Sequence, residues 1–321
     1  MMKKTKLGTS PLEVAGICFG TTSLGDMPNT YGYSVDEERA RTTVRAIFDG
    51  PAAFLDSSRN YGAGRSEQRV GEVIAERGGL PPDIIISTKL DRDMDTGRFD
   101  ASRARQSLEQ SLNALNLDRV HLLHLHDPEH AADLSEVTRK DGALGELFKM
   151  KEERLCDAVG LAAGRTDIMI PILKDWDFDA LITHNRFTLV NRHAEPMLDL
   201  AVERNISVLN AAPYAGGVFA KGSARHGRYV YQEATEEMLE PVRKIEAICA
   251  KHDMPPGALA LQFSMRDPRI TSTICGVSKP ERVQQTLDWA NWPIADEVWQ
   301  DVLALPHSTD DPEATRVYQP D

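Results

Sequence analysis

The chain has 321 residues of ordinary globular composition, a length that suits one (β/α)8 barrel or two smaller domains. Its 37 Lys and Arg against 49 Asp and Glu give a formal charge of −12, which argues against non-specific nucleic-acid binding because that needs clustered cations. Its four cysteines are scattered without a C-x-x-C pair, and no long apolar run follows the N-terminus, so we expect reduced thiols, no signal peptide and no membrane span.

Short apolar runs alternate with longer amphipathic stretches along the chain, as expected for strands that are each followed by a helix. The strand-like runs are residues 14–19, 54–56, 84–88, 120–126, 158–163, 181–187, 206–211 and 272–277. The predicted helices are residues 35–48, with Ser34 as N-cap, 66–76, 101–115, 144–153, 168–173, 194–204, 236–252, 257–265 and, as the last helix, 280–289.

Eight such units favour parallel strands joined by right-handed crossovers. An open, doubly wound sheet would hold fewer strands in a chain split into two domains, and no Pro-, Ser- or Gly-rich linker divides this chain. We therefore predict an α/β fold, a (β/α)8 TIM barrel, as a single domain over residues 1–321. A β-hairpin around residues 8–11 precedes the barrel, where it is a candidate for closing the bottom, and residues 306–321 form an irregular tail.

Polar residues end three consecutive apolar runs. Asp56 ends the second run, Lys89 the third and His126 the fourth, and Tyr61 follows Asp56 on the adjoining loop. Because the active site of a TIM barrel lies at the carboxyl ends of its strands, we expect these four side chains to converge.

Such a group has a definite chemistry. An unperturbed phenol has a pKa of about 10, and a nearby ammonium stabilises its anion and lowers that value. Lys89 would supply the charge, Asp56 would hold Lys89, and His126 would share a proton or donate to a substrate oxygen. A group that moves a proton at a carbonyl or alcohol oxygen, completed by a hydride at the carbon, implies a nicotinamide cofactor.

The sequence resembles the aldo-keto reductases along nearly its whole length. The segments that carry the resemblance are residues 7–10 (LGTS), 19–21 (FGT), 54–62 (FLDSSRNYG), 66–67 (SE) with Gly71, 87–89 (STK) and 125–128 (LHDP). The resemblance implies that Tyr61, Lys89, Asp56 and His126 are the catalytic tetrad. The His-Asp-Pro ending and residues 185–189 (NRFTL) resemble the branch of bacterial D-threo-aldose, L-fucose and pyridoxal dehydrogenases.

The resemblance also implies an NADP or NAD site, with backbone near phosphate after the seventh strand and a helix N-terminus near the adenosine end. The candidate cofactor-binding residues are Gly20, Thr21, Asp56, Asn185, Ala212, Pro213, Tyr214, Gly216, Gly217, Gly276, Ser278, Lys279, Arg282, Gln285 and Thr286.

Three positions depart from the family pattern. Ala162-Ala163 stands where members often have Ser-Asn to hold the nicotinamide amide, so Asn185 or His184 would have to supply that contact. The aromatic residue that stacks on the nicotinamide is replaced by Ala211. Gly276 lies where NADP-specific members carry a Lys, which weakens the case for NADP, while Arg282 keeps it open.

The same residues also allow plainer interpretations. Asp56 and Lys89 would also serve as a structural ion pair, and Tyr61 as a surface tyrosine. Four histidines between residues 121 and 130 suggest zinc, but no further ligand set accompanies them, so no metal is predicted. His124 is interpreted as a histidine of the barrel interior whose hydrogen-bonding groups are satisfied.

The sequence thus predicts an oxidoreductase that transfers a hydride between NAD(P) and an aldose-like or other carbonyl or alcohol substrate. The alternatives are a reductase of small aldehydes or ketones and a non-catalytic, cofactor-sensing regulatory subunit. Tyr31, Tyr33, Asp127, Tyr214 and residues 223–231 are candidate pocket walls. We expect a cytoplasmic monomer or homodimer whose partner is a small molecule, not nucleic acid or membrane.

Overall fold

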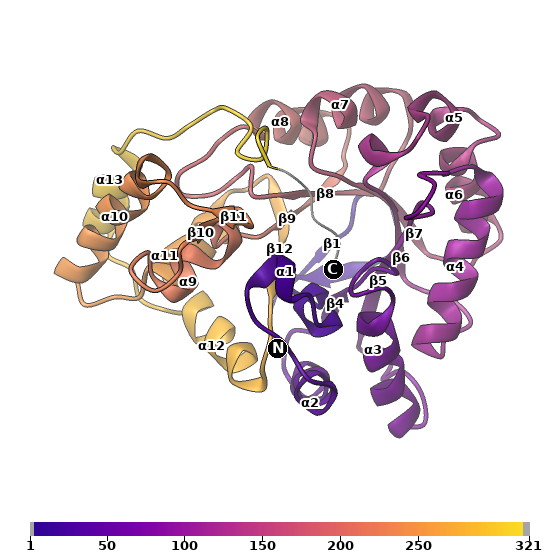
Figure 1. The fold of residues 1–321 in the computed structure, drawn as a ribbon, viewed down its shortest axis with the longest axis horizontal. Helices are drawn as coiled ribbons and strands as arrows, with labels where there is room; N and C mark the ends of the chain where they lie inside the picture. Colours follow the sequence, from indigo (N-terminus) through magenta and orange to yellow (C-terminus); the bar gives the residue numbers. More distant parts are fainter. Residues whose placement is uncertain (1–2, 317–321) are drawn as a thin grey trace.

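The computed structural model describes residues 3–316, and eight parallel strands close into a barrel at its centre (Figure 1). The barrel strands follow the order β12-β3-β4-β5-β6-β7-β8-β9, so each pairs with its neighbour in the chain and β12 closes the ring against β3. Their bounds are β3 Ile17–Gly20, β4 Phe54–Asp56, β5 Ile85–Leu90, β6 Leu122–His126, β7 Ala158–Ala162, β8 Ala180–His184, β9 Ser207–Ala211 and β12 Ile270–Gly276. The (β/α)8 barrel predicted from the sequence is confirmed.

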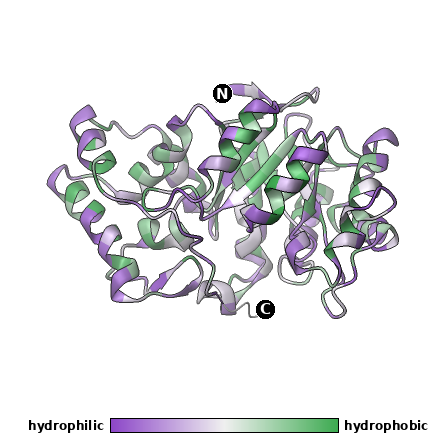
Figure 2. Cartoon of the chain, turned by 90° about the horizontal axis from the view of Figure 1, so that it is seen from above, coloured by the Kyte–Doolittle hydropathy of each residue, from purple (hydrophilic) through white to green (hydrophobic). Residues whose placement is uncertain are grey.

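Helices surround the barrel and turn their apolar faces toward it (Figure 2). Their bounds are α1 Pro28–Tyr31, α2 Glu37–Phe48, α3 Arg65–Glu76, α4 Ala101–Leu115, α5 Leu134–Thr138, α6 Ala143–Glu152, α7 Thr166–Asp175, α8 Glu195–Glu203, α9 Val218–Lys221, α10 Glu236–Lys251, α11 Pro256–Arg266, α12 Pro280–Ala290 and α13 Asp296–Leu303. Within residues 3–316, none of these helices is long and apolar enough to cross a membrane.

Two predictions about helices were wrong. The N-cap of α2 is Asp36, whose carboxylate accepts from the backbone N–H of Arg39 at 2.9 Å, and not Ser34. The helix α12 is followed by a further helix, α13, which buries Val298, Trp299 and Val302. Asp296 and Glu297 in its first turn favour helix initiation, but the segment is too short to show a clear period.

The predicted N-terminal hairpin covers the bottom of the barrel. Strands β1 Lys4–Lys6 and β2 Glu13–Ala15 pair antiparallel, and a small second hairpin, β10 Arg228–Tyr229 with β11 Gln232–Glu233, lies far along the chain. In the turn of the first hairpin, the N–H of Gly8 donates to Ser207 Oγ at 2.8 Å, and Thr9 Oγ1 donates to Asp179 Oδ1 at 2.9 Å. Both acceptors lie at the amino ends of β8 and β9, so the opposite end, where the strands finish, is left open.

Close packing between α3 and α4 depends on Gly71. A Cβ at this position would lie 1.9 Å from the carbonyl oxygen of Ala114, a backbone atom of α4 that cannot rotate away. We expect Gly71→Ala to lower the free energy of unfolding by about 2 kcal/mol, the usual cost of overpacking. Gly16→Ala is the matched control, because a Cβ there meets nothing within 4 Å. Urea unfolding of the two variants measures the difference, and equal stabilities would contradict this packing.

Candidate active site

A buried ion pair joins two of the strand-end residues. Lys89, on β5, donates from Nζ to Asp56 Oδ2 on β4 at 2.6 Å, and also to the carbonyl oxygen of Ser57 at 2.6 Å. The side chains of Lys89 and Asp56 are only 2% and 5% exposed. Ser87 Oγ donates to the other carboxylate oxygen of Asp56 at 2.8 Å, so both ends of the pair are held in place. Burial opposes the charged amine, yet Asp56 and the Tyr61 phenol raise the pKa of Lys89 above its ordinary value.

Tyr61 lies directly beside this pair. The ammonium of Lys89 is 4.8 Å from the centre of the Tyr61 ring, and the ring meets His126 edge to face with 6.0 Å between ring centres. Burial raises the pKa of Tyr61 to about 12, although Lys89 pulls in the opposite direction. The sequence predicted a lowered pKa because it showed the ammonium but not the burial. The phenol is therefore protonated at neutral pH in this structure.

His126 is held by a carboxylate that the sequence analysis missed. Nδ1 of His126 donates to Asp91 Oδ1 at 2.5 Å, and Asp91 Oδ2 accepts from Ser58 Oγ at 2.7 Å and from the backbone N–H of Asn60 at 3.1 Å. Asp91 is 1% exposed. With Nδ1 engaged, Nε2 is the nitrogen left to the cavity, 3.6 Å from Asp127 Oδ2.

The tetrad residues share the wall of a cavity of about 460 Å³ at the open end of the barrel. The candidate cofactor residues on this wall are Gly20, Asp56, Ala212, Tyr214, Gly216, Gly217, Gly276, Ser278, Lys279, Arg282, Gln285 and Thr286. The predicted pocket residues Tyr31, Tyr33, Asp127 and Tyr231 also line it. Sequence reasoning missed Lys221 of α9 and Arg92, which lines the same cavity after β5.

Three candidate cofactor residues do not line the cavity. The hydroxyl of Thr21 donates instead to the carbonyl oxygen of Asp56 at 3.0 Å, so this residue supports the strand end from behind. Pro213 precedes the cavity residue Tyr214 but is not itself on the wall. Asn185 is fully buried in a left-handed turn, with a φ of 58°.

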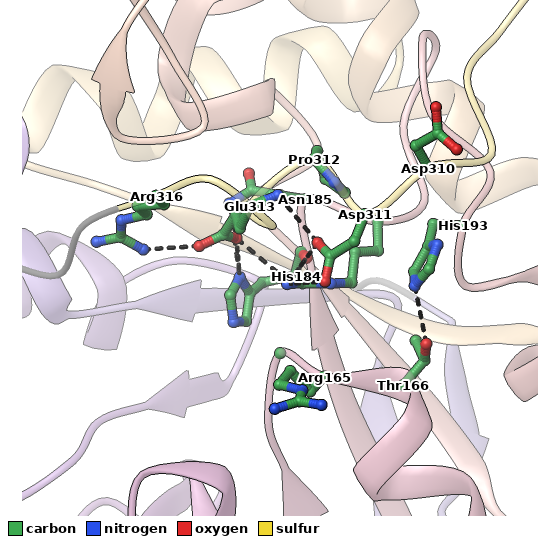
Figure 3. A network of polar contacts seen from close by, with 12 residues as sticks. Arg165, Thr166, His184, Asn185, His193, Asp310, Asp311, Pro312, Glu313 and Arg316 are labelled. Atoms are coloured by element: carbon green, nitrogen blue, oxygen red, sulfur yellow. Dashed lines mark hydrogen bonds and ion pairs between the residues drawn. The ribbon is translucent and has the colours of Figure 1, made fainter.

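The C-terminal tail accepts a hydrogen bond from the side chain of Asn185, as Figure 3 shows. Nδ2 of Asn185 donates to Glu313 Oε1 at 2.9 Å, and His184 Nδ1 lies 2.9 Å from the same oxygen. Arg186 pairs with Asp311 at 2.8 Å, and Arg316 with Glu313 at 2.7 Å. The tail is irregular as predicted over its described part, but these contacts fix it against the residues that follow β8, and the Asn185 amide nitrogen is bonded to the tail and not to the cavity.

The cavity wall fits a dinucleotide. Gly216 and Gly217 adopt φ values of 73° and 102°, a conformation that lets backbone N–H groups approach a phosphate closely. Lys279 and Arg282 stand at the start of α12 on the same wall, and Lys221 adds a third cation. Cationic side chains beside a helix N-terminus are the donor set that binds phosphate.

His124 differs from its predicted role. It is fully buried in the barrel, as expected, but neither ring nitrogen has a hydrogen-bond partner among residues 3–316. Burial lowers its pKa well below the ordinary value, so the ring is neutral. In the same part of the chain, no group of three or more His, Cys, Asp or Glu side chains is arranged to hold a metal ion.

Comparisons with known proteins show what this chain is similar to in sequence and in fold. The family model described as "Aldo/keto reductase family" matches residues 16–305. The chain is 26% identical to D-threo-aldose 1-dehydrogenase from a Pseudomonas species, over 91% of this chain and 94% of that protein. It is 25% identical to pyridoxal 4-dehydrogenase from Microbacterium luteolum, over 92% and 95%. The holo form of aldo-keto reductase AKR11C1 from Bacillus halodurans shares the fold, with a TM-score of 0.79, 22% identity, and coverage of 99% and 100%.

The His126–Asp91 pair predicts a specific pH dependence of stability. Burial disfavours both charges, but the carboxylates of Asp127 and Asp91 raise the pKa of His126, and His126 lowers that of Asp91. The stabilisation from His126 is complete below its unfolded pKa of about 6.5 and is lost as pH rises through the folded value. That from Asp91 is present above about pH 3.9 and is lost as pH falls through its lowered folded value.

Asp91→Asn should therefore cost most, about 1–3 kcal/mol, between about pH 4 and pH 6.5, and less on either side of that range. Urea unfolding of the wild type and the variant at a series of pH values measures this difference. Lys89, Asp127 and Tyr61 also face His126 but are the same in both proteins. A cost that does not change with pH would show that the pair is not charged.

Proposed function

The chain belongs to the aldo/keto reductase family, and from this premise we propose that it oxidises or reduces a small sugar-like or aldehyde substrate through Tyr61. The family consists of oxidoreductases that act on CH–OH or carbonyl groups with NAD(P)H. The observation that carries the proposal is the buried Lys89–Asp56 pair beside the Tyr61 phenol, on the wall of a cavity that fits the cofactor. When bound, the nicotinamide supplies or accepts the hydride at the reacting carbon.

Tyr61 would move the proton at the substrate oxygen. In reduction its phenol, protonated at neutral pH, donates to the carbonyl oxygen as a general acid. In oxidation the same oxygen takes the alcohol proton, and the ammonium of Lys89 stabilises the phenolate. Asp56 fixes Lys89 and balances its charge, which makes it a positioning residue for the amine.

His126 would form a second hydrogen bond to the substrate oxygen, in addition to that from Tyr61. Because Nδ1 donates to Asp91, a neutral ring offers only an acceptor at Nε2, whereas a protonated ring offers a donor. The raised pKa of His126 increases the protonated fraction near neutral pH, which suits donation to a carbonyl oxygen. Asp91 is thus a positioning residue that selects both the orientation and the protonation of His126.

The similarity to aldose and pyridoxal dehydrogenases supports a cyclic hemiacetal or an alcohol as substrate. Steady-state turnover of L-fucose, D-arabinose, pyridoxal and simple aldehydes, each with NAD(H) and with NADP(H), tests the substrate class and the cofactor choice together. Faster turnover of the hemiacetals would support oxidation of sugar-like compounds. Turnover confined to simple aldehydes would assign the chain to the reductases of small carbonyl compounds.

Removal of the Tyr61 hydroxyl tests the chemistry itself. Tyr61→Phe should bind NADPH as well as the wild type but transfer hydride about 10²–10⁴-fold more slowly, the usual contribution of a positioned acid or base. Cofactor fluorescence measures binding and stopped-flow absorbance measures transfer. Tyr229→Phe is the control, since Tyr229 is a buried tyrosine that does not line the cavity. Unchanged transfer in Tyr61→Phe would rule out this mechanism and revive the non-catalytic, cofactor-sensing alternative.

A further inference from the structure

Arg92 differs from the other buried arginines of the described chain. Five arginines in residues 3–316 are at least nine-tenths buried: Arg69, Arg92, Arg103, Arg186 and Arg192. Arg69, Arg103 and Arg192 donate to backbone carbonyl oxygens, and Arg186 pairs with two carboxylates. Arg92 is 8% exposed, yet no described residue accepts a hydrogen bond from its guanidinium or forms an ion pair with it.

The guanidinium of Arg92 borders the cavity, and a guanidinium is always charged. With no partner among the described residues, it is left to bind an anionic group that enters the cavity. Arg92 lines the cavity together with Lys89, His126 and Asp127, so the space that its donors face is the proposed substrate space. Its planar group presents a fork of N–H donors that matches a carboxylate or a phosphate with two parallel hydrogen bonds.

Asp91, the residue before Arg92, is hydrogen-bonded through its backbone N–H, its carbonyl oxygen and its side chain. The N–H of Asp91 donates to Ser107 Oγ at 2.9 Å, and the carbonyl oxygen of Asp91 accepts from Arg103 Nε at 3.0 Å. The Asp91 side chain holds His126. Asp91 therefore positions the imidazole of His126 and is also the chain neighbour of Arg92. An anion at Arg92 and a carbonyl at His126 would both depend on this short segment after β5.

None of the charged side chains that line the cavity within residues 3–316 pairs with Arg92, so Arg92 is left to bind a ligand. Asp56 neutralises Lys89, and Asp91 neutralises a protonated His126. Asp127 is the carboxylate that remains, and it approaches His126 Nε2 at 3.6 Å without forming an ion pair with Arg92. Lys221, Lys279 and Arg282 belong to the wall that fits the cofactor phosphates.

We propose that Arg92 is an anion-binding subsite, and that the substrate is a carbonyl or hydroxyl compound bearing a carboxylate or a phosphate. The proposal rests on the proposed function, because it names the substrate class of the same site. A sugar acid, a semialdehyde acid and a sugar phosphate all offer this chemistry. The subsite binds the anionic group of the substrate while Tyr61 and His126 act on its oxygen.

Matched substrates test the proposal. Succinic semialdehyde is compared with butyraldehyde, and glyceraldehyde 3-phosphate with glyceraldehyde. The wild type should show a kcat/KM about 10–100-fold higher for the anionic member of at least one pair, since a charge-assisted hydrogen bond contributes about 1.5–3 kcal/mol. Arg92→Gln should abolish that preference and leave kcat/KM for the neutral members within about 3-fold. Preference for the carboxylate or for the phosphate identifies which anion the subsite takes, and equal turnover within both pairs would overturn it.

Arg92→Lys tests whether the subsite depends on charge alone or also on the geometry of the guanidinium. A lysine keeps the charge but not the two-pronged geometry, so it should recover part of the preference for phosphate and less of that for carboxylate. Full recovery of both preferences would show that Arg92 acts as a point charge without directional recognition.

A binding measurement separates this proposal from the proposed reaction. Calorimetric titration of malonate into the NADP⁺-saturated protein, in which the cofactor occupies its own phosphate contacts, should show binding that Arg92→Gln abolishes. This result does not require turnover, so it stands even if no tested carbonyl compound reacts. Absence of malonate binding, together with absence of any anionic preference, would refute the subsite while leaving the Tyr61 chemistry intact.

Stability provides the matched control. Arg103 is also 8% exposed, but it is hydrogen-bonded to Asp91 and to the side chains of Gln106 and Gln110. Arg103→Gln should therefore lower the melting temperature, whereas Arg92→Gln should leave it unchanged, because no hydrogen bond or ion pair with a described residue is lost. A fall as large as that of Arg103→Gln would show that Arg92 is structural and would contradict the subsite.

Discussion

The site depends on one ionic contact that is almost fully removed from water, the pair between Lys89 and Asp56. Either charge alone would be strongly unfavourable at this depth, so each residue requires the other. The barrel makes the contact possible, because β4 and β5 are adjacent parallel strands whose carboxyl ends meet at one edge. Tyr61 lies against the ammonium, and in the proposed mechanism this neighbour stabilises the phenolate when the proton leaves.

A second pair near the phenol repeats this arrangement. Asp91 and His126 come from the ends of β5 and β6, their side chains are 1% and 11% exposed, and they are opposite in charge when the ring is protonated. The site therefore contains two compensated pairs around one protonated phenol. Such an arrangement keeps charges close to the Tyr61 oxygen while the two pairs together carry little net charge, and Arg92, which has no partner among residues 3–316, differs from them.

Much of the fold and the tetrad could be predicted from the sequence, because strand ends in a parallel barrel converge and polar residues there interrupt apolar runs. Asp91 could not, since it opens an acidic loop with Asp93 and Asp95 and only the fold brings it to His126. The partnership of Asn185 with Glu313 spans 128 residues and leaves no local pattern. The raised pKa of Tyr61 was also missed, because burial depends on side chains from several distant segments.

The most direct test of the central ion pair is single-turnover hydride transfer by Lys89→Met, measured from pH 5 to pH 10 with near-ultraviolet circular dichroism as the check on folding. If the ammonium of Lys89 stabilises the phenolate, oxidation of an alcohol substrate should slow by at least about 100-fold and should recover partly toward high pH. A folded variant that oxidises the substrate at the wild-type rate across this range would contradict the account.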